Sequence, residues 1–444
     1  MKKIYKKSAY RVLFVLGLLL TTQLVLGKSL TFSEKFEWIY DVDPNATIEL
    51  RNYDCDVVIE SSNSNKVQFV IYVDAQAKEQ TDIDILNNYL ESLSFPARRD
   101  LVRLETTFWD NRSSNSSFGK NVIKMKLKNG KQIILSEFKV KATLHIPESC
   151  LFDLGSKYSK IEMGDIQNLK LNSYDDKIYG KNAPGEVDIS AKYSNLEFGI
   201  FGPTEINIYE SDFTAEKTEG LKIISKYSEI NVNQTGNVDL DGYDDNMTFK
   251  TTGDFELKTK YSDLKCDKTG NLTLEIYDSN LEIDQIGDIR ITESKYSSYK
   301  FGGAGAVKIS STYDDDFSFD KVVSFKANSS KYSEFTMNSL MNSFTILEGY
   351  DDNVKIYNTS ASFTQFDINS KYANVILNTS ETSQLKVDWN TKYGKIDIDE
   401  SEFKTKVMIK DNSEYQYVGF KGTESETMPY IKVRGYDVKM NLNN

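Results

Sequence analysis

The sequence predicts an all-β fold: a β-solenoid (β-helix) of about 14–16 short coils with two strands each, preceded by a smaller β-rich N-terminal domain. Three observations lead to this prediction. A tyrosine recurs at a nearly constant spacing over most of the chain, and apolar residues alternate with polar ones around it. Aromatic residues, which favour strands, are abundant, with 27 Tyr and 24 Phe among 444 residues.

The first 27 residues have the pattern of a secretory signal peptide. A basic start precedes an apolar run at 12–26, and Val25 and Gly27 suit the −3 and −1 positions of a cleavage site. The run is shorter than the ~20 residues of a membrane span, which makes an uncleaved anchor the weaker alternative. We therefore expect an exported protein, in the periplasm, at the cell surface or extracellular. The basic residues are Lys2, Lys3, Lys6, Lys7 and Arg11.

Charge and cysteine content narrow the class of function. The net charge is −12, and removal of the five basic charges of residues 1–27 makes it −17. Such an acidic chain is poorly suited to binding nucleic acid, and no integral membrane segment is expected after signal removal. The three cysteines, Cys55, Cys150 and Cys266, are too few and too far apart for a disulfide framework. A single disulfide between two of them stays an alternative.

Residues 28–150 lack the strict repeat and are predicted to form the N-terminal β-rich domain or cap. An amphipathic helix is expected at 82–95, with Ile85, Tyr89 and Leu93 at helical spacing, and a polar loop at 111–121. The stretch 50–60 resembles one coil of the repeat. Strand-like runs lie at 67–73, 101–109 and 138–147.

Residues 151–444 carry the tyrosine repeat and are predicted to form the solenoid. The spacing alternates between about 16 and 19 residues at first and lengthens toward the end. We expect Tyr415 and Tyr436 to continue the series. Its members are Tyr158, Tyr174, Tyr193, Tyr209, Tyr227, Tyr243, Tyr261, Tyr277, Tyr296, Tyr313, Tyr332, Tyr350, Tyr372 and Tyr393.

Two versions of the unit alternate. In one, lysine precedes the tyrosine and serine mostly follows it, as in SKYSE; in the other, acidic residues follow, as in GYDDN. We call these KY coils and YD coils. Apolar residues stand at i and i+2 on both sides of the tyrosine, which predicts two short strands per coil, each with one buried face. A β-sandwich is the weaker alternative because it does not explain one recurring tyrosine.

Glycines separate many neighbouring apolar pairs and are expected at turns that need positive φ. They are Gly236, Gly253, Gly270 and Gly287.

Stacking offers a reason for the alternating charge. Coils ~4.8 Å apart would bring identical carboxylates together, whereas alternation places lysine diagonal to aspartate. We expect a ladder of opposite charges that fixes the register, and a candidate binding face along it. The lysines are Lys192, Lys226, Lys260 and Lys295, the acidic residues are Asp175, Glu210, Asp244, Asp278 and Asp314, and the tyrosines of the face are Tyr193, Tyr227, Tyr261 and Tyr296.

Catalytic and metal-binding patterns are weak. His145 is the one histidine of the chain, so catalytic or metal sites that need a second histidine are excluded. Paired carboxylates such as Asp244-Asp245 and Asp351-Asp352 could serve sugar hydrolysis or hold calcium, but their uniform repetition favours a solvated acidic face. We expect no cofactor. Glycan binding by the Tyr and Lys rows is an alternative to simple packing at corners.

At this point the sequence resembles a bacterial family of unknown function, the β-strand-repeat, adhesin-like proteins, some members of which are described as auto-transporter adhesin heads. The resemblance rests on TIELRNYDCDVVIE, on VKATLHIPESCLFDLGSKYSKIEMGDI and on the KYS and YDD repeats. It implies an exported solenoid of the cell envelope with an adhesive or scaffolding role and no known chemistry. The partner would be an envelope protein or a glycan. The alternative is a carbohydrate-active enzyme of β-helix type.

Overall fold

The computed structural model describes residues 29–117, 120–379 and 382–443, and these form two compact units. Of the described residues, one unit contains 29–33, 74–90, 109–117 and 120–138, and the other contains 34–73, 91–108, 139–379 and 382–443. The predicted signal peptide at 1–27 lies outside the described residues. Within the described ranges, no helix is long and apolar enough to cross a membrane. Three strands belong to both units: β1 (Leu30–Asp41), β4 (Lys66–Ala77) and β10 (Glu137–Pro147).

The smaller unit holds most of the helix α1 (Gln80–Ser92) and an antiparallel sheet. The predicted helix is confirmed, but its buried side chains are Ile83, Leu86, Tyr89 and Leu90, so the face through Ile85 and Leu93 was wrong. The polar loop predicted at 111–121 is also wrong for its described residues, because 111–117 and 120–121 lie in two strands that pair antiparallel. The sheet contains β7 (Trp109–Ser117), β8 (Lys120–Leu127) and β9 (Gln132–Leu135).

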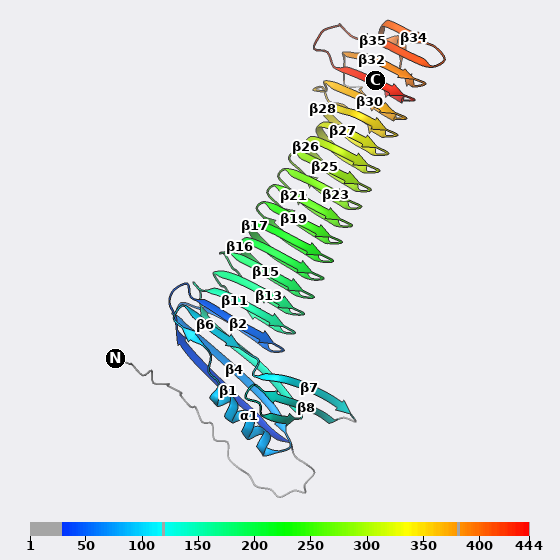
Figure 1. Ribbon diagram of the computed structural model, residues 1–444. Helices are drawn as coiled ribbons and strands as arrows, with labels where there is room; N and C mark the ends of the chain where they lie inside the picture. The colour runs from blue at the N-terminus through cyan, green and yellow to red at the C-terminus, as the bar shows by residue number, and fades with distance from the viewer. Residues whose placement is uncertain (1–28, 118–119, 380–381, 444) are drawn as a thin grey trace. The chain divides into compact units, whose positions relative to one another are not determined.

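The larger unit is a parallel β-solenoid, which confirms the predicted fold class (Figure 1). Each coil contributes one strand before its tyrosine and one after it, and each kind stacks on its equivalents. The first-strand stack includes β2 (Thr47–Tyr53), β11 (Leu151–Lys157), β13 (Asn168–Tyr174), β15 (Val187–Lys192), β19 (Val238–Tyr243), β21 (Phe255–Lys260), β23 (Leu272–Tyr277), β25 (Ile289–Lys295), β30 (Gln365–Lys371), β36 (Tyr430–Tyr436) and β32 (Leu385–Lys392).

The second-strand stack lies on the other side of the corner. In five places the chain continues without a break from a second strand into the next first strand: β16 (Asn195–Tyr209), β17 (Asp212–Lys226), β26 (Ser298–Tyr313), β27 (Asp316–Lys331) and β28 (Glu334–Tyr350). The separate second strands are β3 (Asp56–Ser62), β12 (Lys160–Met163), β14 (Lys177–Gly180), β18 (Glu229–Thr235), β20 (Asn246–Thr251), β22 (Asp263–Lys268), β24 (Asn280–Gln285), β29 (Asn353–Ile356), β31 (Asn374–Asn378), β37 (Lys439–Asn443) and β33 (Lys395–Asp397).

The first coil of the solenoid comes from early in the chain. Strands β2 and β3 pair with β11 and β12, so residues 47–62 form the coil expected at 50–60, ahead of the boundary drawn at residue 150. On the outer side of this coil, β6 (Leu101–Glu105) pairs with β2 and part of β10 pairs with β3. Strand β5 (Ala97–Arg98) then pairs antiparallel with β6. The end of the stack is therefore covered, as a solenoid requires.

The last coils are not stacked in chain order. Strand β36 lies between β30 and β32, and β37 lies between β31 and β33, so the C-terminal residues insert between two earlier coils. Tyr436 thus belongs to the series, whereas the prediction for Tyr415 was wrong: it is buried on β35 (Glu414–Lys421), which pairs antiparallel with β32. The short helix η1 (Glu400–Glu402) and the edge strand β34 (Lys404–Lys410) complete this end.

Alternating burial along each strand builds a narrow core. In β21, for example, Phe255, Leu257 and Thr259 point inward between exposed residues, and Cys266 is buried on β22 as expected. Farther along, Tyr299 stacks on Phe317 with ring centroids 4.5 Å apart. All three cysteines are buried and free, so the disulfide left open by the sequence does not form.

The interpretation of the repeated glycines was wrong. Among the described glycines, positive φ occurs at Gly130, Gly422 and Gly435 and at none of these four. The physical reason is close backbone approach: a Cβ at Gly236 would lie 1.9 Å from the carbonyl oxygen of Glu219 on the preceding coil. Glycine is required here because two stacked backbones approach too closely for a side chain.

Candidate binding surface

Successive coils place their tyrosines one residue out of step. Tyr243 pairs with Lys226 on one neighbour and with Lys260 on the other. Each corner therefore has three aligned positions, which are residues 226–228 in a KY coil and residues 243–245 in the neighbouring YD coil. The first alternates between Lys and Tyr, the second alternates between Tyr and Asp or Glu, and the third is mostly Ser or Asp. The alternating charge beside the tyrosine thus reflects this one-residue offset between KY and YD coils.

The second corner position forms the bend. Its φ lies between 45° and 62° in every coil, whether the residue is Tyr in a KY coil or an acidic residue in a YD coil. This left-handed conformation costs an L-residue about 1–2 kcal/mol, less for Asp or Asn. Tyrosine nevertheless occupies the bend in eight coils: Tyr158, Tyr193, Tyr227, Tyr261, Tyr296, Tyr332, Tyr372 and Tyr393.

The offset brings all tyrosines into one outward-facing row, which we call the tyrosine stripe. Neighbouring rings meet edge to face, with centroids 5.2–5.8 Å apart and interplanar angles of 63–87°. This is a favoured geometry for aromatic pairs. In stacking order the rings are Tyr53, Tyr158, Tyr174, Tyr193, Tyr209, Tyr227, Tyr243, Tyr261, Tyr277, Tyr296, Tyr313, Tyr332, Tyr350, Tyr372, Tyr436 and Tyr393.

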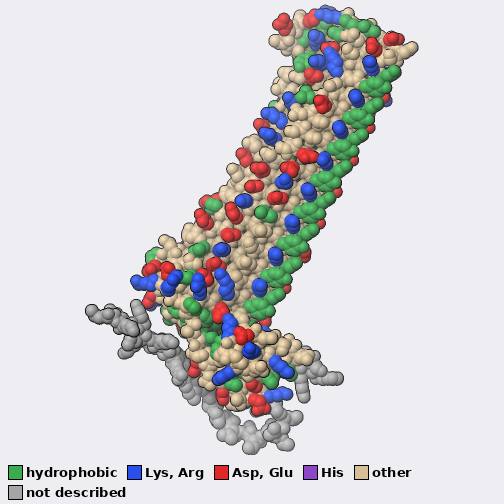
Figure 2. Space-filling view, viewed as in Figure 1, with side chains coloured by type: hydrophobic (Ala, Val, Ile, Leu, Met, Phe, Trp, Pro, Cys, Tyr) green, Lys and Arg blue, Asp and Glu red, His purple; other side chains and the backbone are tan. Residues whose placement is uncertain are grey.

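Figure 2 shows the stripe as an unbroken hydrophobic band with Lys side chains along one border and Asp or Glu side chains along the other. Eleven of its rings are exposed by 36–57%. All residues of the face predicted from the sequence lie here. Tyr193, Tyr227, Tyr261 and Tyr296 belong to the stripe, Lys192, Lys226, Lys260 and Lys295 to the lysine border, and Asp244, Asp278 and Asp314 to the acidic border.

The predicted ladder of ion pairs was wrong in its contacts. Within the described part of the chain, no ion pair joins these lysines to Asp175, Glu210, Asp244, Asp278 or Asp314. Lys295 instead contacts Glu293 on its own strand, at 2.7 Å between Nζ and Oε1. The tyrosine rings separate the two borders, and Lys157 illustrates this with its ammonium 5.7 Å from the ring centre of Tyr174. The alternation therefore creates two charged borders rather than pairs.

A second row of polar groups lies buried beneath the stripe, and sequence reasoning missed it. From Cys55 to Ser333, the backbone N–H at the third corner position donates to the side chain at the same position of the next coil, as from Ser194 to Ser211 Oγ (3.1 Å) and from Ser228 to Asp245 Oδ1 (2.9 Å). The serine hydroxyl donates in turn to the carbonyl two residues earlier, as from Ser211 to Tyr209 (2.9 Å). The recurrence of Ser directly after Tyr in KY coils, and of Asp or Ser two residues after Tyr in YD coils, was the available signal.

The second Asp of each YDD triplet belongs to this buried row, so the solvated acidic face was a wrong prediction for these residues. Burial raises the pKa of Asp176, Asp245 and Asp315, against opposing hydrogen bonds from Ser or Thr hydroxyls and backbone N–H groups. Burial also raises the pKa of Asp352 to about 6. These carboxylates satisfy backbone donors at the bend. They are structural groups and not exposed acids or ligands.

An open groove of about 960 Å³ crosses the starts of the first strands. Most of its charged lining comes from one column of the sheet, in which equivalent residues of successive coils pair directly. Catalytic carboxylates need unlike surroundings, whereas the carboxylates of this column all occupy the same strand position in successive coils. The groove has the character of a sheet surface rather than an active site. The column is Lys170, Asp188, Glu205, Lys222, Asp239 and Glu256.

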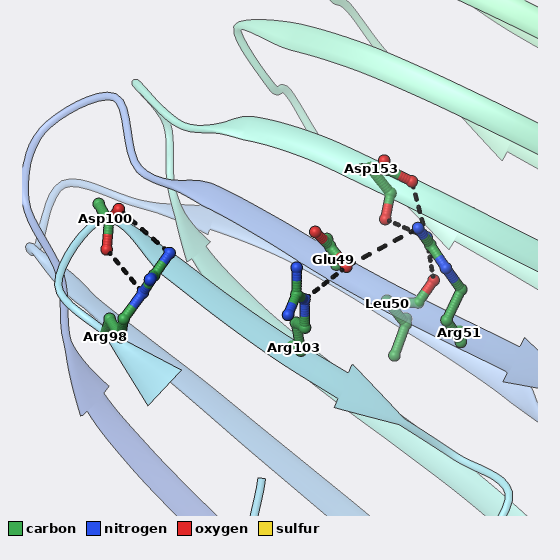
Figure 3. Close-up of polar contacts among 7 residues, drawn as sticks. All are labelled: Glu49, Leu50, Arg51, Arg98, Asp100, Arg103 and Asp153. Carbon is green, nitrogen blue, oxygen red and sulfur yellow. Dashed lines mark hydrogen bonds and ion pairs between the residues drawn. The ribbon is translucent and has the colours of Figure 1, made fainter. Parts of the chain in front are cut away.

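A cluster of arginines and carboxylates joins β6, β2 and β11 near the first coil (Figure 3). Arg103 Nε lies 3.1 Å from Glu49 Oε2, and Arg51 Nη1 lies 2.6 Å from Asp153 Oδ1. Arg51 also donates to the carbonyls of Leu50 and Asp153, and Arg98 pairs with Asp100. Each guanidinium is matched by a carboxylate, so the cluster ties three layers together rather than forming an anion site.

The remaining chemistry-bearing groups are dispersed. His145 lies on β10 with Nδ1 3.1 Å from Glu60 Oε2, which fits the predicted strand position. Among the described residues, no group of three or more His, Cys, Asp or Glu side chains is placed to hold a metal ion. Comparison of the chain with protein-family models, curated proteins and solved structures finds no match.

Proposed function

We propose that this protein is an exported, non-enzymatic solenoid of the cell envelope that binds or scaffolds through its tyrosine stripe. The unbroken row of sixteen outward rings carries the proposal. Contiguous exposed apolar patches of more than a few hundred Å² mark interaction sites, and tyrosine is enriched in interfaces.

The backbone at the bend adds a second argument. Gly or Asn would fit the left-handed second position more easily than tyrosine, and the corner hydrogen bonds come from the third position. Eight tyrosines therefore hold a costly conformation without contributing to the buried row. Their common effect is the continuous aromatic surface, which supports a role in binding.

Export and the adhesive role are supported by sequence. The basic and apolar pattern of residues 1–27 is typical of a signal peptide, and the adhesin-like resemblance extends over the coils. The repeated lining of the groove favours binding over the alternative of a carbohydrate-active enzyme.

The test uses purified residues 28–444 on a glycan array and on isolated cell-envelope fractions. Changing Tyr193, Tyr227, Tyr261 and Tyr296 to Asn keeps a residue that tolerates positive φ and removes four rings. We expect at least tenfold weaker binding. The matched control changes Tyr179 and Tyr357 to Ser, since both are exposed but lie outside the stripe. Equal loss in both variants, or no binding to either target, would contradict the proposal. Cell fractionation with N-terminal sequencing tests export separately.

A further inference from the structure

The two borders of the tyrosine stripe carry opposite charge over its whole length. The lysine border comes from the first corner position of KY coils: Lys157, Lys192, Lys226, Lys260, Lys295, Lys331, Lys371 and Lys392. The acidic border comes from the second corner position of YD coils: Asp54, Asp175, Glu210, Asp244, Asp278, Asp314, Asp351 and Asp437. Figure 2 shows the two borders on opposite sides of the band. The surface is therefore an apolar row with a positive and a negative edge.

We propose that the partner of this surface is a second copy of the chain, packed stripe against stripe with the two solenoids parallel. A twofold axis along the stripe turns the lysine border of one copy toward the acidic border of the other. An antiparallel pair, related by an axis across the stripe, would oppose lysine to lysine and acid to acid. The charge pattern thus favours one orientation, and a self-complementary patch is what a twofold dimer requires.

The spacing of the charges fits this arrangement. Lysines recur every second coil, about 9.6 Å apart at ~4.8 Å per coil, and so do the acidic residues, displaced by one coil. Each lysine of one copy would therefore face the interval between two carboxylates of the other, about one coil above and below. A lysine side chain is long and flexible enough to reach either.

The exposed aromatic area is also sufficient for a stable pair. Eleven rings of the stripe are exposed by 36–57%. At about 200 Å² for each aromatic side chain, they offer on the order of 1,000 Å² per copy before the borders are counted. A standard specific interface buries about 800 Å² per partner. The stripe is thus large enough, and its composition of aromatic centre and charged rim matches known interfaces.

This inference rests on the proposed function, because both use the stripe as the binding surface. The experiment separates them by making two charge variants of residues 28–444. One changes Lys192, Lys226, Lys260 and Lys295 to Glu, and the other changes Asp175, Asp244, Asp278 and Asp314 to Lys. At low salt we expect the wild type to sediment as a dimer, and each variant alone to associate at least tenfold more weakly. An equimolar mixture should regain dimer, because each acidic edge then meets a basic one.

Recovery in the mixture also shows that both variants fold, and circular dichroism provides an independent check. A wild type that remains monomeric at all concentrations, or variants that fail to associate when mixed although folded, would overturn the inference. If that monomeric protein still binds glycan or envelope through the stripe, the proposed function stands although the dimer inference fails.

Orientation is tested by cross-linking. Tyr393 supplies the last ring of the stripe and Tyr53 the first, and the native cysteines are buried. In a parallel dimer, Tyr393→Cys should form a disulfide with itself under mild oxidation. A mixture of Tyr393→Cys and Tyr53→Cys proteins should give only the two homodimeric products. Cross-links between the two variants in place of these products would show antiparallel packing and refute the parallel arrangement.

Discussion

A single side chain at the third corner position determines what its neighbours can be. Where this position is Asp, the residue before the YD tyrosine is small: Ser173, Gly242, Thr312 or Gly349. Where it is Ser, as at Ser211 and Ser279, the same place holds Ile208 or Ile276. The structure explains the pairing, since a Cβ at Gly242 would lie 2.7 Å from Asp245 Oδ2. A buried carboxylate occupies the space that isoleucine fills in the other coils.

The effects of changing residues 242 and 245 on stability should therefore be coupled. We expect Gly242→Ala to lower the free energy of unfolding by about 1–3 kcal/mol, because the new methyl group overpacks the carboxylate. The double change Gly242→Ala with Asp245→Ser should recover a large part of this loss. A double-mutant cycle in urea measures the coupling, and additive effects of the two changes would contradict the explanation.

Asp352 should give the stability a dependence on pH. It is 1% exposed, accepts hydrogen bonds at Oδ1 from Ser330 and Ser333, and has no partner at Oδ2 among the described residues. Burial raises its pKa from 3.8 to about 6. A raised carboxyl pKa means that the folded state binds the proton more tightly than the unfolded state. The stability that this tighter binding contributes is complete below pH 4 and is lost as the pH rises to 6.

We expect Asp352→Asn to remove that dependence. Relative to the variant, the wild type should lose roughly 3 kcal/mol of unfolding free energy between pH 4 and pH 7, from a shift of about two pKa units. Urea titrations at several pH values measure the difference, with Asp351→Asn as the control for an exposed neighbouring carboxyl. If the difference in unfolding free energy between the wild type and Asp352→Asn stayed constant from pH 4 to pH 7, the explanation would be ruled out.

At the scale of the coil, the corner depends on its buried row of hydrogen bonds more than on its charges. Ser211→Ala would leave the backbone N–H of Ser194 buried without a partner. We expect a loss of about 1–3 kcal/mol in unfolding free energy, the penalty of an unsatisfied buried donor. Ser190→Ala, at an exposed site on β15, should change it by less than about 0.5 kcal/mol. Equal effects at the two sites would show that the buried row contributes little.

Much of the coil could be predicted from sequence because burial alternates with period two around each tyrosine. The strands about Tyr243 and Tyr261 follow this pattern directly. The bend could not be placed, because a residue in the left-handed region breaks the alternation and its position differs by one residue between KY and YD coils. The roles of Asp245 and Gly236 also escaped, since both depend on which atoms of the next coil lie opposite them. Stacking distances of this kind are not encoded in one coil alone.

The candidate surface was identified by its residues but not by its geometry. Alternating Lys and Asp beside tyrosine is visible in the sequence, and the structure does bring Lys226 and Tyr227 beside Tyr243 of the next coil. Diagonal ion pairs were expected because the equivalent residues of successive coils, the tyrosines among them, were placed directly over one another. The aromatic rings keep the two kinds of charge apart, an effect that follows only from the offset between coils.

At the scale of the whole solenoid, one rule holds over all sixteen rings: KY and YD coils alternate. Sequence order breaks this rule near the end, where SKYAN (370–374) is followed by another KY coil, TKYGK (391–395), and a YD coil, GYDV (435–438), comes last. Insertion of β36 between β30 and β32 restores the alternation. The wider spacing after Tyr350 and the two successive KY coils were signals that could have predicted it.

The inserted strand should therefore hold the last coil in place. Without residues 425–444, β32 could reach β30 only by stacking one KY coil on another, which brings Lys371 beside Lys392. Two lysines directly opposite on neighbouring strands are destabilising. We expect deletion of 425–444 to abolish protection from hydrogen exchange in 385–421, whereas the coils up to Leu377 keep theirs. Deletion of 441–444 alone, which leaves β36 intact, is the control.

Adding the missing strand as a separate peptide makes the experiment decisive. A synthetic peptide of residues 425–444 should occupy the vacant position between β30 and β32, because parallel pairing on both sides is available to it. Protection in 385–421 should then return with increasing peptide. A peptide with Tyr436-Asp437 changed to Lys-Tyr would present a KY corner to two KY neighbours and should bind more weakly. If 385–421 stayed protected in the truncated protein, or if both peptides restored protection equally, the alternation of coil types would not be what specifies the order of the stack.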